Sequence, residues 1–250
     1  MQENLERAIR WIEEHHPRRI TALTGAGISA ESGVPTFRDA GGLWETHRAE
    51  ELATPQAFAR DPRLVWRWYE WRRGVIRDAV PNDGHLALAS LEELLESKGG
   101  SLTLITQNVD ALHHRAGSRN LIELHGNIFR VRCTREGTST ERTESFAELP
   151  PLCSCGAMLR PDVVWFGEML PAGAIEAGSV AVAESDLLLV VGTSGVVHPA
   201  AGLVSMLRRG EAIEVNPHET PLSRMARFSI HAPAALALPR LAAAVERSLE

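Results

Sequence analysis

The stretch TGAGISAESGVPTFRD, residues 24–39, decides the fold of this chain. It follows a short apolar run over 20–23, which predicts a buried strand, and it leads into small residues with which a helix can begin. Gly25, Gly27 and Ala30 have the GxGxxG/A spacing of a dinucleotide-binding turn, in which the glycines allow a tight turn and a close approach to a pyrophosphate. Alone, this spacing also fits a glycine-rich turn that binds no nucleotide.

The second half of this stretch is unusual for such a turn. Residues 32–35 should stop any helix, because they contain a glycine and a proline. Phe37 and Arg38 then place an aromatic ring and a fixed positive charge just past the turn. A dinucleotide-binding turn is usually followed by an acidic residue about 20 positions further on, and Glu45 and Glu50 match that spacing only approximately.

The composition is that of a globular protein. The chain has 250 residues, of which 44% are hydrophobic and 23% charged, so it can bury a sizeable core. Its net charge of −6 argues against a nucleic-acid binder that works by neutralising phosphates. No apolar run reaches the ~20 residues of a membrane helix, and the polar N-terminus is unlike a signal peptide. We therefore expect a cytoplasmic protein without a nucleic-acid or membrane partner, and the oligomeric state stays open.

Predicted strands and helices alternate along most of the chain. Apolar periodicity predicts helices over 3–16, 62–79 and 85–97, and short apolar runs predict strands over 102–106, 121–124, 187–191, 212–215 and 228–231. This alternation is typical of an α/β fold with a parallel sheet covered on both faces. Two segments interrupt it: residues 38–80, and the polar segment from Cys133 to Leu159, which carries all three cysteines.

Polar side chains follow several of the predicted strands. Gln107, Asn108 and Asp110 come after the strand over 102–106, and ligands of open α/β sheets bind beyond the carboxyl ends of strands. His125 follows the next strand, and its ordinary pKa of about 6.5 suits a general base. The alternatives are that Asn108 caps a helix and that His125 is structural. Further on, the loop at 192–194 and Asn216 could contact a ribose or a phosphate.

Taken in order, these motifs resemble one family. GAGISAESGVPTFRD, TQNVDALH, HG, RPDVVWFGE, GTS and VNP occur in the order found in the sirtuins, the NAD-dependent protein-lysine deacylases, and the resemblance spans residues 18–240. It implies an inverted Rossmann-type parallel sheet in an NAD-binding large domain, made of 1–37, 81–129 and 159–250. A helical insertion at 38–80 and a degenerate zinc-ribbon-like insertion at 130–158 would form the small domain.

The resemblance also implies roles for individual residues. His125 would deprotonate the nicotinamide ribose, Asn108 and Asp110 would lie against that ribose and the reaction water, and Gln107 would bind a ribose hydroxyl. The other cofactor-binding residues that it implies are Gly25, Ala26, Gly27, Ala30, Glu31, Thr36, Phe37, Arg38, Gly192, Thr193, Ser194, Asn216 and Ala234. NAD would be consumed, and nicotinamide and 2′-O-acyl-ADP-ribose would be released.

The substrate implied is an acylated lysine in a protein or peptide. Its backbone would pair by strand addition with the segment Val163, Val164, Trp165, Phe166 and Gly167. A buried strand is the alternative structure for this segment.

The predicted helix over 62–79 carries residues that indicate which acyl group the substrate has. Tyr69 and Arg72 share one apolar helix face with Trp68, and an arginine there needs an anionic partner or an aromatic face. Stacking on Trp68, or pairing with Asp61 or Glu70, would satisfy it. The pair also resembles the Tyr-x-x-Arg signature of desuccinylase-type sirtuins, in which the guanidinium binds the acyl carboxylate.

We therefore expect desuccinylation and demalonylation with deacetylase activity, and the small Ala40 would leave room for the longer acyl chain. Two other functions remain open. One is an NAD-dependent dehydrogenase, and the other is a non-catalytic module that binds NAD or ADP-ribose.

The cysteines depart from the family pattern of two Cys pairs on one zinc ion. Glu136 stands where the cysteine after Cys133 would fall, and Cys153-Ser154-Cys155 is one residue shorter than CxxC. Three thiolates with Glu136 or water could still hold zinc. We expect a degenerate site without metal.

Overall fold

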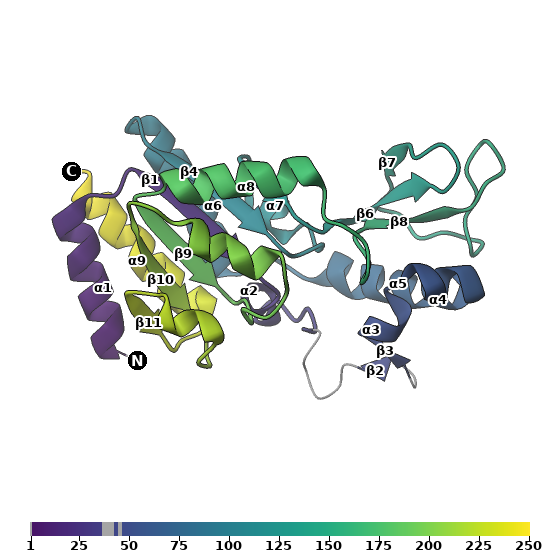
Figure 1. The fold of residues 1–250 in the computed structure, drawn as a ribbon, viewed down its shortest axis with the longest axis horizontal. Coiled ribbons are helices and arrows are strands. Elements are labelled where there is room, and N and C mark those ends of the chain that lie inside the picture. The colour runs from purple at the N-terminus through teal and green to yellow at the C-terminus, as the bar shows by residue number, and fades with distance from the viewer. Residues whose placement is uncertain (1, 37–42, 45–46) are drawn as a thin grey trace.

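The large part of the molecule is a parallel sheet of six strands in the order β11-β10-β9-β1-β4-β5. The structure is a computed structural model that describes residues 2–36, 43–44 and 47–250 (Figure 1). The strands are β1 (Arg19–Thr24), β4 (Ser101–Thr106), β5 (Leu121–Glu123), β9 (Leu187–Val191), β10 (Glu211–Val215) and β11 (Phe228–Ile230). Each lies where the apolar runs predicted a strand, and the predicted α/β fold class is confirmed.

Helices cover both faces of this sheet, as Figure 1 shows. On one face lie α1 (Gln2–His15), α6 (Asp83–Ser97) and α9 (Ala234–Ser248), and they share a core with the side chains of β1, β4 and β11. On the other face lie α8 (Ala172–Glu184) and the 3-10 helix η1 (Ala200–Met206). Because both faces are covered, the central strands are continuously apolar, and all five residues of β9 are buried. No helix in the described part of the chain is long and apolar enough to cross a membrane.

The strand order reverses between β1 and β9. From β1 the chain continues to β4 and β5 on one side, and β9, β10 and β11 follow on the other side. Such a switch point is where open α/β sheets bind ligands. The turn after β1 leads into the single-turn helix α2 (Gly27–Ala30), which ends before residues 32–35, as predicted.

The glycines of the first turn are required by close packing against the turn after β9. A Cβ atom on Gly27 would lie 2.7 Å from the Gly192 Cα atom, and one on Gly25 would lie 2.8 Å from the Thr193 Cα atom. Gly192 itself has a φ of +59°, in the left-handed region that favours glycine. These glycines therefore let two strand-end turns touch at the switch point.

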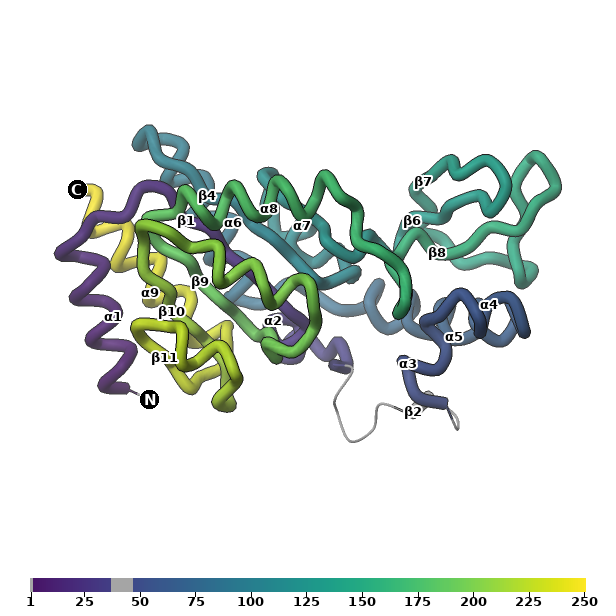
Figure 2. Tube along the Cα trace, in the orientation of Figure 1, coloured from purple at the N-terminus to yellow at the C-terminus, as the bar shows by residue number. Residues whose placement is uncertain are grey.

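A smaller module stands at one end of the sheet, and the trace in Figure 2 shows it beside the large sheet. Its helices are α3 (Ala49–Leu52), α4 (Pro55–Arg60) and α5 (Pro62–Asp78), and its antiparallel sheet has the order β7-β6-β8. The strands are β6 (Gly126–Cys133), β7 (Ser139–Glu141) and β8 (Leu159–Val163), with a separate two-stranded ladder of β2 (Leu43–Trp44) and β3 (His47–Arg48). This sheet therefore extends beyond the predicted insertion at both ends, to Gly126 and Val163.

Arg73 joins α5 to the small sheet. Its side chain is fully buried and pairs with Glu70 over 2.8 Å. The guanidinium also donates hydrogen bonds to the carbonyl oxygens of Ile128, Arg142 and Glu144, over 2.8, 2.6 and 2.7 Å. A buried charge needs such partners, and together they fix the helix that carries Tyr69 and Arg72.

Candidate functional site

Side chains from the carboxyl ends of three strands meet at the switch point. The Gln107 side-chain nitrogen donates to the Thr193 hydroxyl oxygen over 3.0 Å, and the Asn216 side-chain nitrogen donates to the Thr193 carbonyl oxygen over 2.9 Å. Ser194, next in this loop, is half-buried. The structure thus brings together the strand-end residues that the sequence predicted to contact a ribose or a phosphate.

A second group lies on the other side of the first turn. The Asn108 side-chain nitrogen donates to the Gly25 carbonyl oxygen and to the Ser29 hydroxyl oxygen, both over 3.2 Å. The next helix, α7 (Leu112–Ala116), has Ala111 rather than Asn108 at its N-cap, so the helix-cap alternative for Asn108 does not hold. Ser29 in turn donates to the Asp110 carboxylate over 2.7 Å. Burial raises the pKa of Asp110 above its ordinary value.

Two buried histidines support this second group, and the sequence reasoning missed both. His85 lies 3.3 Å from the Ser29 hydroxyl and His113 lies 3.0 Å from the Thr24 hydroxyl, with the two rings 4.8 Å apart. Burial lowers the pKa of His85 to about 4 and that of His113 well below its ordinary value, so both rings are neutral at pH 7. The sequence signal that could have revealed them is a histidine at a core position of a helix.

His125 lies between the two parts of the molecule, where β5 leads into β6. Its Nδ1 atom lies 2.8 Å from the Gln107 carbonyl oxygen. Because a carbonyl oxygen only accepts, Nδ1 carries the proton and Nε2 keeps a lone pair. Burial lowers the pKa of His125, which favours this neutral form at pH 7. The ring is therefore prepared to accept a proton at Nε2.

Tyr69 and Arg72 are three positions apart on α5 and lie near Trp165 and Trp68. The Tyr69 hydroxyl oxygen accepts a hydrogen bond from the Trp165 indole nitrogen over 2.9 Å, and burial raises the pKa of Tyr69 to about 12. The half-buried Arg72 guanidinium lies 5.3 Å from the centre of the Trp68 ring, one of the contacts expected for it. Burial lowers the pKa of Arg72, whereas the charges of Tyr69 and Asp110 act to raise it.

The predicted peptide-binding segment continues from β8, and its residues differ in exposure. Val163 pairs with Gly126 in the small sheet, and the Val164 N–H donates to the His125 carbonyl oxygen over 2.9 Å. Trp165 is buried against the core of the small module, whereas Phe166 is 46% exposed and Gly167 is also exposed. The Phe166 N–H donates to the Ala53 carbonyl oxygen over 2.9 Å, so the exposed end of the segment lies beside α3 and α4.

Comparison with known proteins identifies the family. The profile of the Sir2 family matches residues 25–199, which is more than half of the chain. This chain belongs to the Sir2 family. An NAD-dependent protein deacylase of Archaeoglobus fulgidus is 49% identical over 249 residues, covering 98% of this chain and 99% of the relative. One from Thermus thermophilus is 52% identical over 231 residues, covering 91% and 90%.

Solved Sir2 structures have the same fold as this Sir2 protein. A Sir2 homologue in complex with NAD has a TM-score of 0.88 and 47% identity, covering 98% of this chain and 95% of its own. A mutant Sir2 homologue in complex with 2′-O-acetyl ADP ribose has a TM-score of 0.90 and 48% identity, with 98% of each chain covered.

The other residues of this Sir2 protein that were predicted to bind cofactor or substrate differ in exposure and contacts. Phe37, Arg38 and Ala40 lie outside the described residues. The Glu31 carboxylate accepts a hydrogen bond from the Ala235 N–H over 3.0 Å, so it caps α9 beside the buried Ala234. Ala26 and Thr36 are half-buried, and Ala30 is exposed.

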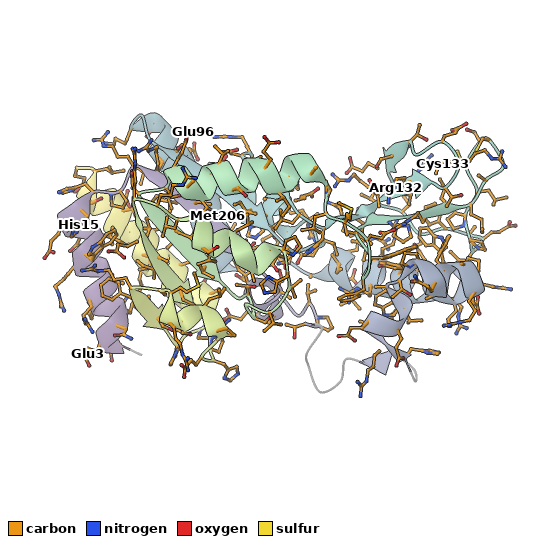
Figure 3. All side chains as sticks on the ribbon, viewed as in Figure 1. Glu3, His15, Glu96, Arg132, Cys133 and Met206 are labelled. Atoms are coloured by element: carbon orange, nitrogen blue, oxygen red, sulfur yellow. The ribbon has the colours of Figure 1, made fainter. Side chains whose placement is uncertain are left out.

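The three cysteines of this Sir2 protein come together with Glu136. One ligand atom from each of Cys133, Glu136, Cys153 and Cys155 can be chosen so that all four lie within 4.8 Å of one another. Thiolates and a carboxylate are among the ligands that zinc takes in proteins, so this donor set fits the zinc ion that the family resemblance implies. Figure 3 shows Cys133 in the small module, at the opposite end of the molecule from His15.

Proposed function

We propose that this chain is an NAD-dependent protein-lysine deacylase that prefers acidic acyl groups such as succinyl and malonyl and also removes acetyl groups. The observation that carries the proposal is His125, a neutral base whose Nδ1 proton is held by the Gln107 carbonyl oxygen. It lies between the switch point, where NAD would bind, and the segment from Val163 to Gly167, which would bind the peptide. The deacylase names of the relatives from Archaeoglobus and Thermus support the same reaction.

The switch point would bind the dinucleotide. NAD supplies an electrophilic ribose carbon and nicotinamide as its leaving group. Gln107, Thr193 and Asn216 already form one hydrogen-bonded group there, and they offer amide and hydroxyl groups to a ribose. Asn108 is fixed by Gly25 and Ser29, so it is oriented before a ligand arrives.

His125 would act after the acyl oxygen has replaced nicotinamide. With Nδ1 fixed, Nε2 accepts the proton of a ribose hydroxyl, and that hydroxyl oxygen attacks the acyl carbon. Water then completes the release of the lysine and of 2′-O-acyl-ADP-ribose.

Arg72 would select the acyl group. The charge of Asp110 acts to raise the pKa of Arg72, and that of Arg72 acts to lower the pKa of Asp110, which supports a place for Arg72 near the ribose side of the site. Tyr69 stays protonated at pH 7, and its oxygen accepts from Trp165, so its own proton can be donated to an acyl carboxylate. A guanidinium and a phenol together can bind such a carboxylate.

The test is a kinetic comparison of acetyl-lysine and succinyl-lysine peptides with NAD. We expect His125→Ala to abolish formation of 2′-O-acyl-ADP-ribose from both. Arg72→Met should lower kcat/KM for the succinyl peptide by at least about tenfold and spare the acetyl peptide, because a charged hydrogen bond contributes about 1.5–3 kcal/mol. Arg67→Met, an exposed arginine on the same helix, is the matched control. Equal losses on both peptides would contradict the proposal that Arg72 binds the acyl carboxylate.

The same assay separates the two alternative functions. A dehydrogenase would form NADH without needing an acylated peptide, and a binding module would bind NAD and release no nicotinamide. We expect nicotinamide release that depends on the acylated peptide, and no NADH.

A further inference from the structure

We propose that Glu136 is the fourth ligand of a zinc ion held by Cys133, Cys153 and Cys155, in a site of three thiolates and one carboxylate. The family pattern implies four cysteines, so the new assignment is the carboxylate. It does not depend on the deacylase activity. We expected a degenerate site from the spacing alone, and the geometry of the side chains leads to this different assignment.

Two distances between the side chains are close to those of a tetrahedral site. Ligand atoms bound to zinc with Zn–S bonds of about 2.3 Å lie about 3.8 Å apart. The Cys133 and Cys155 sulfurs are 3.5 Å apart, and the Cys153 sulfur lies 3.8 Å from a Glu136 carboxylate oxygen. A disulfide would need a sulfur separation of about 2.0 Å, and all three cysteines are free. The cluster thus has the size of a metal site.

Two backbone turns hold the four side chains in place. The Glu136 N–H donates to the Cys133 sulfur over 3.4 Å, and the Gly137 N–H donates to the Cys133 carbonyl oxygen over 3.0 Å. In the second turn the Gly156 N–H donates to the Cys153 carbonyl oxygen over 2.9 Å. Each turn ends on a glycine with positive φ, +69° at 137 and +81° at 156. Both turns direct their ligand atoms to one point, although Glu136 and Cys153 are 17 positions apart in the chain.

Among the described residues, the Glu136 carboxylate has no cation as an ion-pair partner. In the described part of the chain, no arginine or lysine lies within ion-pair distance of its carboxylate. The nearby Arg135 guanidinium donates to the Cys155 carbonyl oxygen over 2.9 Å and so supports the second turn.

The segment around the cluster buries little surface of its own. From Thr134 to Glu148 the chain is almost entirely exposed. It is held by the pairing of β7 with β6 and, further along, by hydrogen bonds from Arg73 and Arg77 to the carbonyls of residues 142–144. A segment that buries so little apolar surface is the type that a metal ion stabilises. A zinc ion would anchor the segment at the end that Arg73 does not reach.

Cobalt titration of the full-length protein tests the assignment. Endogenous metal is removed with a chelator under reducing conditions, and Co²⁺ is added while its visible absorption is followed. We expect one equivalent to bind, with the bands of a tetrahedral ion and thiolate-to-cobalt charge transfer. Glu136→Cys should raise the charge-transfer intensity in the proportion of four thiolates to three. Glu136→Ala should weaken Co²⁺ binding by at least about tenfold.

The matched controls are Glu141→Cys and Glu141→Ala, since Glu141 is an exposed residue of the same module outside the cluster. Both should titrate like wild type. Unchanged Co²⁺ affinity in Glu136→Ala would overturn the role of Glu136 as a ligand. A wild-type protein that keeps three titratable thiols and binds neither Co²⁺ nor zinc would overturn the site as a whole.

Discussion

The Tyr69 hydroxyl oxygen accepts a hydrogen bond from the Trp165 indole nitrogen over 2.9 Å, which joins the proposed acyl pocket to the proposed peptide segment. Both side chains are buried in the core of the small module. Trp165→Phe keeps an aromatic ring there and removes the donor that orients the Tyr69 hydroxyl. We expect kcat/KM for a succinyl peptide to fall about 5- to 10-fold, since a buried hydrogen bond contributes about 1 kcal/mol.

The acetyl peptide should lose less in the same variant, because it has no carboxylate for Tyr69 to bind. Trp71→Phe, at a tryptophan that is 43% exposed on the same helix, serves as the control and should change neither substrate. Equal losses on the two peptides would show that Trp165 supports the fold rather than the acyl pocket.

The pH dependence of the reaction should report on His125. Burial lowers the pKa of this ring below its ordinary value of about 6.5, and the base acts in its neutral form. The plot of kcat/KM against pH should therefore stay flat from pH 8 to below 6.5 and fall only at lower pH, as the ring gains a proton. An acidic limb with its midpoint above 6.5 would contradict the burial argument.

Gly27 should not tolerate a side chain. A Cβ atom there would lie 2.7 Å from the Gly192 Cα atom, so Gly27→Ala forces two strand-end turns apart. We expect a loss of about 1–3 kcal/mol in the free energy of unfolding, together with weaker NAD binding. Gly74→Ala in α5 is the control, because a Cβ atom there would meet nothing within 4 Å. That control should stabilise the protein by about 0.5–1 kcal/mol in urea unfolding.

Arg73 should matter for stability more than any exposed arginine of its helix. Arg73→Met removes the cation that neutralises Glu70 and leaves the carbonyl oxygens of Ile128, Arg142 and Glu144 without this donor. We expect a loss of about 3–5 kcal/mol, measured by denaturant unfolding. Arg77→Met, at an exposed arginine that contacts the same segment, should lose no more than about 1 kcal/mol. Similar losses in both variants would show that Arg73 contributes no more to stability than a surface arginine does.

The buried pair of His85 and His113 should make the protein sensitive to acid. Their pKa values are lowered in the folded state, to about 4 for His85, so the unfolded chain binds protons first as the pH falls. Stability should therefore be complete above about pH 6.5 and decline below it, by roughly 1 kcal/mol per pH unit for each ring. Unfolding of wild type and His113→Asn at several pH values measures this slope, which should be shallower in the variant.

The sequence alone determined the α/β fold and the strand-end residues of the site. Apolar runs and helical periodicity are local patterns, so the strands ending at Thr24, Thr106 and Val191 could be read directly. The positions of Gln107 and Asn108 followed from the rule that ligands bind at the carboxyl ends of parallel strands. The motif order further pointed to the family, and the comparisons confirm it.

Only the tertiary structure decided which groups meet. Ser29 and Asp110 are 81 positions apart, and their hydrogen bond depends on how α2 packs against the end of β4. Glu31, predicted to face a cofactor, caps α9 from a distance of 204 positions. The grouping of Glu136 with three cysteines likewise arises from two turns in three dimensions. Spacing describes neighbours along the chain, whereas hydrogen bonds and metal ligation depend on neighbours in space.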